Sequence, residues 1–430
     1  MNEKTNKKLN DKSIYQIFVR NYSKEGTFKA VEDDLTRIKR MGFDILYLMP
    51  INKIGLENRK GSLGSPYAIA DYTLINEELG SKEDFISLIS KAHELGFLIM
   101  LDVVMNHTSY ESDYAIKHPE WFYLKDNKFA NKVGDWSDII DLDYSNKDLI
   151  ASASTMLADY VKLGVDGFRC DVASLVPLKF WKVAINKCHD INKNCFFLGE
   201  SVEGYFIEEF RIAGFDIETD ASLYECFDML YDYDIFDAFN ELIKDEISIK
   251  NYSKIVQRQL ATYKEHDLKV RYLENHDKER SSNLIANLNS YNNYLSYIMF
   301  VKGVGFIYNG QEYHSKHLPS LFDKDTIDFD NREIDHSHLI KKLNSIRKLG
   351  HRFNPYQVIV NDLVLAGRFI GKENDLVGYF NIKQYRGKLK VDLKDGSYIN
   401  LIDNQEIIVK DGEIDLISQA IIIEIKKDRK

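Results

Sequence analysis

The chain has 430 residues, of which 44% are hydrophobic, and its formal net charge at pH 7 is -10. A chain of this length and composition buries a large core, and it is too long for one ordinary domain unless that domain is a barrel. The acidic balance, with no sustained basic block away from the two ends, makes nucleic acid and anionic membrane surfaces poor partners.

The beginning of the chain, MNEKTNKKLNDKSIYQ, is positively charged but lacks the apolar segment of a secretory signal. No later stretch approaches the roughly 18 consecutive apolar residues of a membrane span. We therefore expect a soluble, cytoplasmic protein with no membrane partner. The cysteines form no CxxC pair and have no histidine at ligand spacing, so we expect reduced thiols packed as small hydrophobic side chains. They are Cys170, Cys188, Cys195 and Cys226.

Strand-like and helix-like segments alternate along the first part of the chain. The strand-like runs span 14–19, 45–50 and 97–105, and the amphipathic helical runs span 28–41 and 81–95. The second helical run opens with Ser-x-x-Asp at Ser81 and stops before Gly96, which are start and stop signals of a helix. This order predicts a parallel sheet with helical crossovers.

The alternation breaks after Met105, over a polar and aromatic stretch without long periodic segments. A loop of this length inside a compact domain is usually functional. The alternation then resumes with a helix over 148–163, a strand ending at Asp171, a helix over 180–192 and a strand over 195–199. The break therefore predicts an insertion after the third strand.

The second half of the chain supplies the remaining strands. Runs at 270–275 and 304–309 flank an apolar helix that ends at Val301, and one more helix is expected over 337–349. Seven strands are clear, and another is expected within 222–231. Eight parallel strands with crossovers close into a (β/α)8 TIM barrel, which is an α/β fold.

Past residue 353 the pattern changes to short alternating runs separated by turn signals, which predicts a C-terminal antiparallel β-sandwich domain. The expected organisation has three parts. They are a catalytic barrel over 1–105 and 148–352, a short inserted domain B over 106–147, and the C-terminal β domain over 353–430.

Charged residues close several of the predicted strands: Arg169 and Asp171, then Glu200, then His276 and Asp277. In a TIM barrel, the C-terminal strand ends form the active-site face. Two carboxylates on neighbouring strands suit retaining glycoside hydrolysis, in which they lie about 5 to 5.5 Å apart. For Asp171 alone, a loop cap or an ion pair is equally open. Glu200 ends an apolar strand, so it must be partly exposed, paired or shifted in pKa.

Four motifs, in order, resemble the conserved blocks of the α-amylase family, glycoside hydrolase family 13. They are DVVMNH at 102–107, GVDGFRCDVA at 164–173, FFLGES at 196–201 and ENHD at 274–277. The runs IYQIFVRNY, GFDILYLMP, SPYAIADY and GVGFIYNGQE are similar to further parts of the family's barrel. The resemblance covers nearly the whole chain, including the C-terminal β domain.

The resemblance implies a catalytic role for each matched carboxylate. Asp171 would be the nucleophile that forms a covalent glycosyl-enzyme, and Glu200 would be the acid and base. Asp277 would be the third carboxylate, which grips substrate hydroxyls and favours distortion of the sugar ring. Arg169, two residues before Asp171 on the same strand face, would hold the nucleophile ionised and oriented.

The resemblance also implies substrate-binding residues. His107 and His276 would hydrogen-bond sugar hydroxyls, and Tyr67 would stack against the sugar ring; a lone histidine more often has a packing role, but both lie beside acid-bearing strand ends. Several aromatic side chains of the insertion either line outer sugar subsites or form a local core, and we favour the core. They are Trp121, Phe122, Tyr123 and Trp136.

The motifs depart from the family's pattern in two places. Calcium-dependent members usually carry a Lys-His pair three and four residues after the nucleophile, where this chain has Ser174 and Leu175. Asn106 is the only matched candidate ligand, and one ligand does not make a calcium site. We expect no metal site and no required cofactor, with calcium as the open alternative. Residues 140–143 read Ile-Asp-Leu-Asp, which leaves the choice between α-1,4 and α-1,6 bonds open.

The sequence therefore predicts a retaining hydrolase of α-1,4-glucosidic bonds whose substrate partner is a maltodextrin, starch or a glycogen fragment. An exo-acting α-glucosidase, a cyclomaltodextrin hydrolase or a glucanotransferase on the same scaffold stays open. A non-catalytic sugar-binding relative would lack part of the catalytic set, which is complete here. Another TIM-barrel enzyme would have to match four ordered motifs by coincidence. The oligomeric state stays open.

Overall fold

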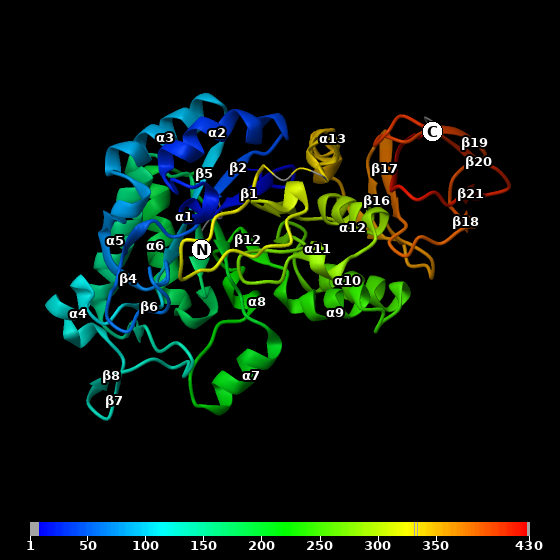
Figure 1. The fold of residues 1–430 in the computed structure, drawn as a ribbon. Helices are drawn as coiled ribbons and strands as arrows, with labels where there is room; N and C mark the ends of the chain where they lie inside the picture. Colours follow the sequence, from blue (N-terminus) through cyan, green and yellow to red (C-terminus); the bar gives the residue numbers. More distant parts are fainter. Residues whose placement is uncertain (1–7, 331, 333, 428–430) are drawn as a thin grey trace.

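Eight parallel strands close into a barrel in the computed structural model, which describes residues 8–330, 332 and 334–427 (Figure 1). In order around the barrel, the strands are β1 (Ser13–Ile17), β2 (Ile45–Leu48), β5 (Leu98–Val104), β10 (Gly167–Asp171), β11 (Phe196–Gly199), β12 (Met229–Tyr231), β13 (Leu268–Arg271) and β14 (Val304–Tyr308). The predicted TIM barrel is confirmed. Residues 1–7 and 428–430, at the outer ends of the expected domains, lie outside the described part.

Helices connect the barrel strands and surround the barrel (Figure 1). They are α1 (Val19–Tyr22), α2 (Phe28–Arg40), α3 (Lys82–Glu94), α5 (Lys147–Leu163), α6 (Leu178–Ile191), α7 (Gly204–Ile212), α8 (Asp220–Leu223), α9 (Tyr233–Ile243), α10 (Ile249–Thr262), α11 (Ser281–Leu284), α12 (Leu288–Phe300) and α13 (Ser337–Arg347). Helix α3 begins as predicted: Ser81 and Asp84 each accept a hydrogen bond from the other's backbone N–H.

Two of the predicted strands differ in detail from the structure. The strand expected within 222–231 exists as β12, but it has only three residues, which is why no long apolar run marks it. The strand expected over 270–275 is shifted, because β13 spans Leu268–Arg271. After Arg271 the chain leaves the sheet, and the Asn275 side chain accepts a hydrogen bond from the Asp277 N–H at 2.9 Å. This local turn occupies the end of the run that the pattern assigned to the strand.

The insertion follows β5 and lies at one side of the barrel mouth (Figure 1). It contains β6 (His107–Thr108), α4 (Asp113–Lys117), the hairpin of β7 (Leu124–Lys125) and β8 (Lys128–Phe129), and β9 (Ile140–Asp141), which pairs with β6. Trp121 and Phe122 are buried in it, and the Trp121 ring stacks on His118 with centroids 3.9 Å apart. These two aromatic residues form a local core, as we favoured.

A second, smaller excursion follows β2. It is the hairpin of β3 (Asn52–Ile54) and β4 (Ile69–Ile75), whose connecting loop carries Tyr67. Short 3-10 helices complete the regular structure: Glu77–Leu79, Pro119–Trp121, Ala173–Leu175, Gln311–Tyr313 and His351–Phe353. Every helix in the part of the chain that the structure describes is too short or too polar to cross a bilayer.

The C-terminal part is antiparallel, as predicted. A four-stranded sheet has the order β15 (Tyr356–Val358), β16 (Leu365–Ile370), β17 (Asn374–Phe380) and β22 (Ile421–Lys426). Two further pairs are β18 (Lys388–Lys390) with β21 (Glu413–Asp415), and β19 (Gly396–Ile399) with β20 (Glu406–Val409). Asn293 of α12 joins this domain to the barrel through the Ser418 carbonyl and the Asn381 N–H.

Candidate active site

The ends of β10 and β11 place two of the predicted carboxylates side by side. Asp171 is the last residue of β10, and Glu200 directly follows β11. Because Cys170 pairs with Gly199 in the parallel register, Asp171 and Glu200 occupy the next matching positions. The Glu200 N–H still donates to the Cys170 carbonyl at 3.0 Å. Neighbouring strands lie about 4.8 Å apart, so the two backbones are adjacent.

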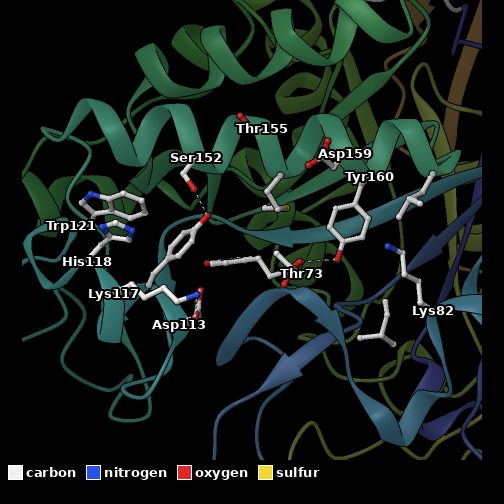
Figure 2. A pocket seen from close by; sticks show the side chains of 15 residues that line it. Thr73, Lys82, Asp113, Lys117, His118, Trp121, Ser152, Thr155, Asp159 and Tyr160 are labelled. Atoms are coloured by element: carbon white, nitrogen blue, oxygen red, sulfur yellow. Dashed lines mark hydrogen bonds and ion pairs between the residues drawn. The ribbon is translucent and has the colours of Figure 1, made fainter.

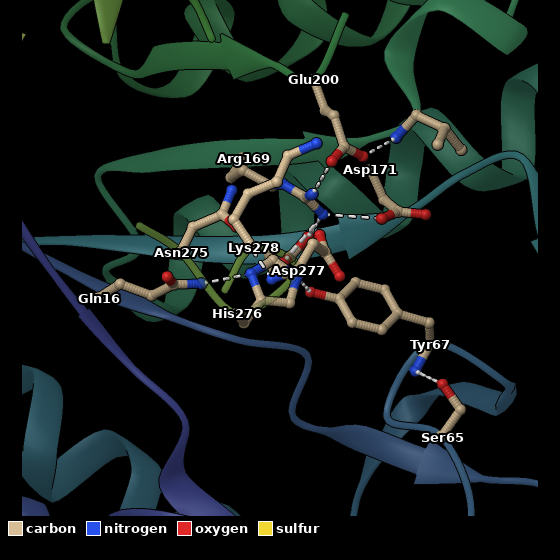
Figure 3. A network of polar contacts seen from close by, with 12 residues as sticks. Gln16, Ser65, Tyr67, Arg169, Asp171, Glu200, Asn275, His276, Asp277 and Lys278 are labelled. Atoms are coloured by element: carbon tan, nitrogen blue, oxygen red, sulfur yellow. Dashed lines mark hydrogen bonds and ion pairs between the residues drawn. The ribbon is translucent and has the colours of Figure 1, made fainter. Parts of the chain in front are cut away.

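Arg169 lies between these carboxylates (Figure 3). Its Nη1 is 2.7 Å from Asp171 Oδ1 and 2.9 Å from Asp102 Oδ1, and its Nη2 is 2.6 Å from Glu200 Oε1. Asp102 and Arg169 are directly paired across β5 and β10, and both are buried. One guanidinium therefore faces three carboxylates in a site where little water reaches them.

Burial and these neighbouring charges shift the pKa values of Asp171 and Asp102. Burial raises the pKa of Asp171, Arg169 lowers it, and Glu200 and Asp102 raise it again, with a net result well above the ordinary value. Burial likewise raises the pKa of Asp102 despite Arg169. Arg169 contacts Asp171 as the expected orienting residue, but its guanidinium charge is divided among three carboxylates. Such carboxylates titrate as a group.

Glu200 is paired rather than exposed. Its Oε2 accepts a hydrogen bond from the Val172 N–H at 2.8 Å, and its Oε1 accepts from Arg169. The Tyr233 hydroxyl lies 3.4 Å from the same Oε1. Of the three outcomes expected for Glu200, namely exposure, pairing or a shifted pKa, the structure shows pairing.

Asp277 and His276 follow β13 and reach the same site (Figure 3). Asp277 is the most open of the three predicted carboxylates, with 39% of its side chain exposed, and its Oδ2 is 3.1 Å from His276 Nε2. His276 Nδ1 lies 2.8 Å from Gln16 Nε2. Burial, followed by Arg169, lowers the pKa of His276 to about 4, so the ring is neutral at pH 7.

Tyr67 contacts both Asp102 and His276. Its hydroxyl lies 3.0 Å from Asp102 Oδ2 and 2.5 Å from His276 Nε2. Its ring stacks on the His276 ring, with centroids 5.5 Å apart and planes 14° from parallel. The structure therefore brings Tyr67, His276 and Arg169 into one cluster with the carboxylates.

His107 lies on the insertion side of the mouth, where β6 follows β5. It is buried, its Nδ1 is 3.2 Å from Asn106 Nδ2, and its ring lies 5.6 Å from Trp136. Burial lowers its pKa to about 4. His107 also hydrogen-bonds the backbone of Tyr67, so it connects domain B to the loop that carries Tyr67.

Sequence reasoning did not assign several side chains of this cluster. Asp102 lies in a quoted motif but received no role, and Gln16, Tyr47 and Tyr233 were not singled out. Tyr47 donates to Asp102 Oδ2 at 2.5 Å, deep in the barrel. A signal was present for Gln16 and Asp102, because each is a single polar residue within an otherwise apolar strand. Burial of such a residue requires a polar partner.

Asn106, the matched candidate calcium ligand, has polar partners on both its side-chain amide and its backbone carbonyl. Its amide nitrogen lies 3.3 Å from Asp141 Oδ1, and its carbonyl accepts from the Leu142 N–H. Among the described residues, no group of three or more His, Cys, Asp or Glu side chains could hold a metal ion. Calcium takes six to eight oxygen ligands, so the expectation that no calcium is required stays a prediction.

A cavity of about 580 Å³ lies elsewhere, between β4, α4 and α5 (Figure 2). Tyr114 and Trp121 line it, together with several charged side chains. Its acids are already paired with lysines, Asp113 with Lys117 at 2.7 Å and Asp159 with Lys162 at 2.7 Å. The cavity therefore lacks the shared, unbalanced carboxylates that distinguish the barrel mouth.

Comparison with known proteins agrees with the fold. The sequence profile described as "Alpha amylase, catalytic domain" matches residues 6–136 and 120–348. A second profile, "Bacterial Alpha amylase C-terminal domain", matches residues 356–423. The chain therefore belongs to the α-amylase family.

Two solved structures are similar over nearly their whole length. An α-amylase from Lactobacillus plantarum is 42% identical, with a TM-score of 0.94 over 97% of this chain and 99% of that one. The maltogenic α-amylase AmyB from Thermotoga neapolitana is 31% identical, with a TM-score of 0.87 over 98% of this chain and 100% of that one.

The curated relatives are longer proteins. "Alpha-amylase MalA" of Haloarcula japonica is 27% identical over 281 residues, which are 63% of this chain and 39% of the relative. An α-1,4-glucan:maltose-1-phosphate maltosyltransferase of Picrophilus torridus is 32% identical over 210 residues, which are 44% of this chain and 33% of the relative. The chain thus spans well under half the length of these relatives.

Proposed function

We propose that the protein is a retaining glycoside hydrolase that cleaves α-1,4-glucosidic bonds in maltodextrins, starch or glycogen fragments. The observation that carries this proposal is the pair Asp171 and Glu200, which sit at matching positions on adjacent strands and share Arg169. A strand spacing of about 4.8 Å suits the carboxylate separation of about 5 to 5.5 Å in retaining enzymes. The similar solved structures are α-amylases, which supports the same substrate class.

The first step forms a covalent glycosyl-enzyme. The Asp171 carboxylate attacks the anomeric carbon while protonated Glu200 gives its proton to the glycosidic oxygen, and the carbon–oxygen bond to the leaving chain breaks. In the second step the Glu200 carboxylate takes a proton from water, whose oxygen attacks the anomeric carbon and releases Asp171. Two inversions leave the product in the α configuration.

The negative charge of the cluster moves during this cycle. Before the first step Asp102 and Asp171 are ionised and Glu200 is protonated; after it Asp171 is an ester and Glu200 is ionised. Arg169 therefore faces two anions throughout, and its guanidinium, which contacts both Asp171 and Glu200, stabilises whichever of them carries the charge. Arg169 therefore orients Asp171 for attack and afterwards favours the ionised, basic form of Glu200.

The other predicted residues bind the sugar in this proposal. Asp277 is 39% exposed, so it can accept hydrogen bonds from hydroxyls of the distorted ring. His276 and His107 are neutral at pH 7 and hydrogen-bond hydroxyls without adding charge. Tyr67, already stacked on His276, presents its ring to the sugar at the cleaved bond.

A glucanotransferase is the second candidate. The observation that favours it is the similarity to maltosyltransferases, which share 30 to 33% identity over 41 to 45% of this chain. In that case a sugar hydroxyl replaces water in the second step, with the same roles for Asp171 and Glu200. Transfer would appear as products longer than the substrate.

Proton NMR and chromatography of products from maltoheptaose test the proposal. We expect new reducing ends to appear first as α anomers, and an end-blocked maltoheptaose to give internal fragments. Initial β anomers would contradict retention, and cleavage of free but not end-blocked maltoheptaose would favour an exo-acting enzyme. Glu200→Gln should lower turnover of unactivated maltoheptaose by about 10²- to 10⁴-fold. Turnover within a few-fold of wild type would contradict the role of Glu200.

A further inference from the structure

Tyr233 lies directly behind the acid/base carboxylate. It is the first residue of α9, which begins one residue past the short strand β12, and it is buried. Its hydroxyl is 3.4 Å from Glu200 Oε1. Sequence motifs give no reason to single it out, because the strand that positions it has only three residues.

The hydrogen bonds around Tyr233 fix the direction in which its hydroxyl donates. Asn275 Oδ1 accepts from the Asp277 N–H at 2.9 Å, so the other end of the Asn275 amide is its NH₂ group. This NH₂ donates to the Tyr233 oxygen at 3.2 Å. The phenol oxygen is therefore an acceptor toward Asn275, and its own hydrogen is left to point at Glu200.

Tyr233 keeps that hydrogen over the working pH range. Burial raises the pKa of its phenol, and the negative charges of Glu200 and Asp277 raise it further. The Lys278 ammonium lies 4.8 Å from the centre of the Tyr233 ring and also pairs with Glu203 at 3.0 Å. The ring is thus packed in place while its hydroxyl stays a donor.

All the groups bonded to Glu200 in this structure are donors: the Val172 N–H, Arg169 Nη2 and the Tyr233 hydroxyl. Three donors suit an acceptor-only carboxylate. The arrangement matches the ionised form, which is the base of the second step. The titratable or charged groups around Glu200 are Arg169 and Asp171 of β10, Tyr231 of β12, Tyr233 of α9, and His276, Asp277 and Lys278 after β13.

We propose that Tyr233 is a positioning residue for Glu200, which donates its hydroxyl to the ionised carboxylate and holds it ready to take a proton from water. Asn275 aligns the Tyr233 hydroxyl and so connects the Asp277 turn to the acid/base. This inference rests on the proposed role of Glu200. It extends that role by assigning a side chain that stabilises one of the two protonation states.

The pH dependence of kcat/KM for maltoheptaose, whose leaving group needs a proton, tests the inference in Tyr233→Phe. In a retaining enzyme the falling limb at high pH reports loss of the Glu200 proton. Removing a donor to the carboxylate makes that proton harder to lose, so we expect the limb to move to higher pH by about half a unit. Coincident limbs in wild type and Tyr233→Phe would overturn the inference.

Tyr272→Phe is the matched control. Tyr272 is also buried, and its ring lies 6.1 Å from that of Tyr233. Its hydroxyl has no hydrogen-bond partner among the described residues. Loss of this hydroxyl should leave the falling limb in place, whereas an equal shift in both variants would indicate a general packing effect and contradict the inference.

Replacement of Tyr233 by 3-fluorotyrosine provides a nearly isosteric second variant, should Tyr233→Phe fold poorly. Fluorine makes the phenol a stronger donor, so the falling limb should move to lower pH, opposite to the shift in Tyr233→Phe. A shift to higher pH, or none, would count against the inference. If Glu200→Gln keeps full activity, the proposed function fails; if only the Tyr233 variants match wild type, the function stands and the role of Tyr233 fails.

Discussion

Two buried arginines of this barrel differ in the number of carboxylates that they face. Arg280 pairs with Glu274 alone, at 2.6 Å, and its remaining nitrogens donate to the His317 and Asn309 carbonyls. Arg169 faces Asp102, Asp171 and Glu200, and its Nε has no hydrogen-bond partner among the described residues. Both arginines are almost fully buried, so exposure does not distinguish them.

The two arginines differ in whether the carboxylates around them are fully paired. Glu274 is satisfied on both oxygens, since Oε1 accepts from Arg280 and Oε2 accepts from the N–H and hydroxyl of Ser281. In the Arg169 cluster one guanidinium faces three carboxylates; burial raises the pKa of Asp171 and of Asp102, and Glu200 and Asp102 raise that of Asp171 further. A balanced pair stabilises the fold, whereas an unbalanced cluster keeps a carboxylate whose protonation can change. Glu274 and Asp171 both come from short motifs in which charged residues follow an apolar run, so the sequence does not distinguish them.

The largest expected effect is on catalysis, in Asp171→Asn. Without the nucleophile, turnover of maltoheptaose should fall by at least about 10⁴-fold, measured as the release of reducing ends. A loss of less than tenfold would show that Asp171 does not form the glycosyl-enzyme.

Asp171→Asn should lower activity without lowering the stability of the fold. The pKa of Asp171 is raised in the folded state, so its ionised form destabilises the fold at pH 7. Asp171→Asn removes that charge and should leave the urea unfolding midpoint unchanged or higher. A clearly lower midpoint would place Asp171 among the structural carboxylates.

Glu274→Gln should show the reverse pattern. It leaves Arg280 buried without its anion, which costs about 3 to 5 kcal/mol of unfolding free energy when a buried pair is broken. Activity per folded molecule, measured well below the unfolding temperature, should stay within a few-fold of wild type. Stability near that of wild type, combined with lost activity, would remove the distinction between the two clusters.

His107 should contribute a pH-dependent part of the stability. Its pKa is about 4 in the folded state against 6.5 ordinarily, so the unfolded chain binds more protons between these values. Its contribution is complete above pH 6.5 and is lost as pH falls toward 4, by up to about 3 kcal/mol. Urea unfolding of wild type and His107→Asn between pH 4 and 7 should therefore give curves that converge at low pH. Parallel curves would exclude the contribution.

The smallest effect is expected from a chelator. If no calcium is required, as we predict from Asn106 being the only matched ligand, EDTA should shift the melting temperature by less than about 1 °C and leave turnover unchanged. Restoration by added calcium of a lowered melting temperature would contradict this expectation.

The fold could be predicted where the sequence pattern and burial agree. Long apolar strands such as β5 can be predicted because residues on both faces are apolar. Capped helices such as α3 can be predicted because residue types mark both ends. The three-residue β12 could not be placed within its ten-residue window, since its pairing partners β11 and β13 define it more than its own composition does. Pairing between distant segments has no local signal.

The sequence predicted which residues gather at the site better than it predicted how their charges interact. The strand-end rule and the motifs brought Asp171, Glu200 and Asp277 together, and the structure places all three at the mouth. The division of Arg169 among three carboxylates could not be predicted, because it depends on the side-chain packing of Asp102 opposite Arg169. The Tyr233 contact to Glu200 depends in the same way on where β12 ends.

Covalent trapping in the Glu200→Gln variant tests the central claim most directly. A maltosyl fluoride needs no acid to leave, and without the Glu200 base the second step is slow, so the glycosyl-enzyme should accumulate. Peptide mass spectrometry should find one maltosyl group esterified to Asp171. Hydrolysis of the fluoride without any adduct, or an adduct on another carboxylate, would contradict the account.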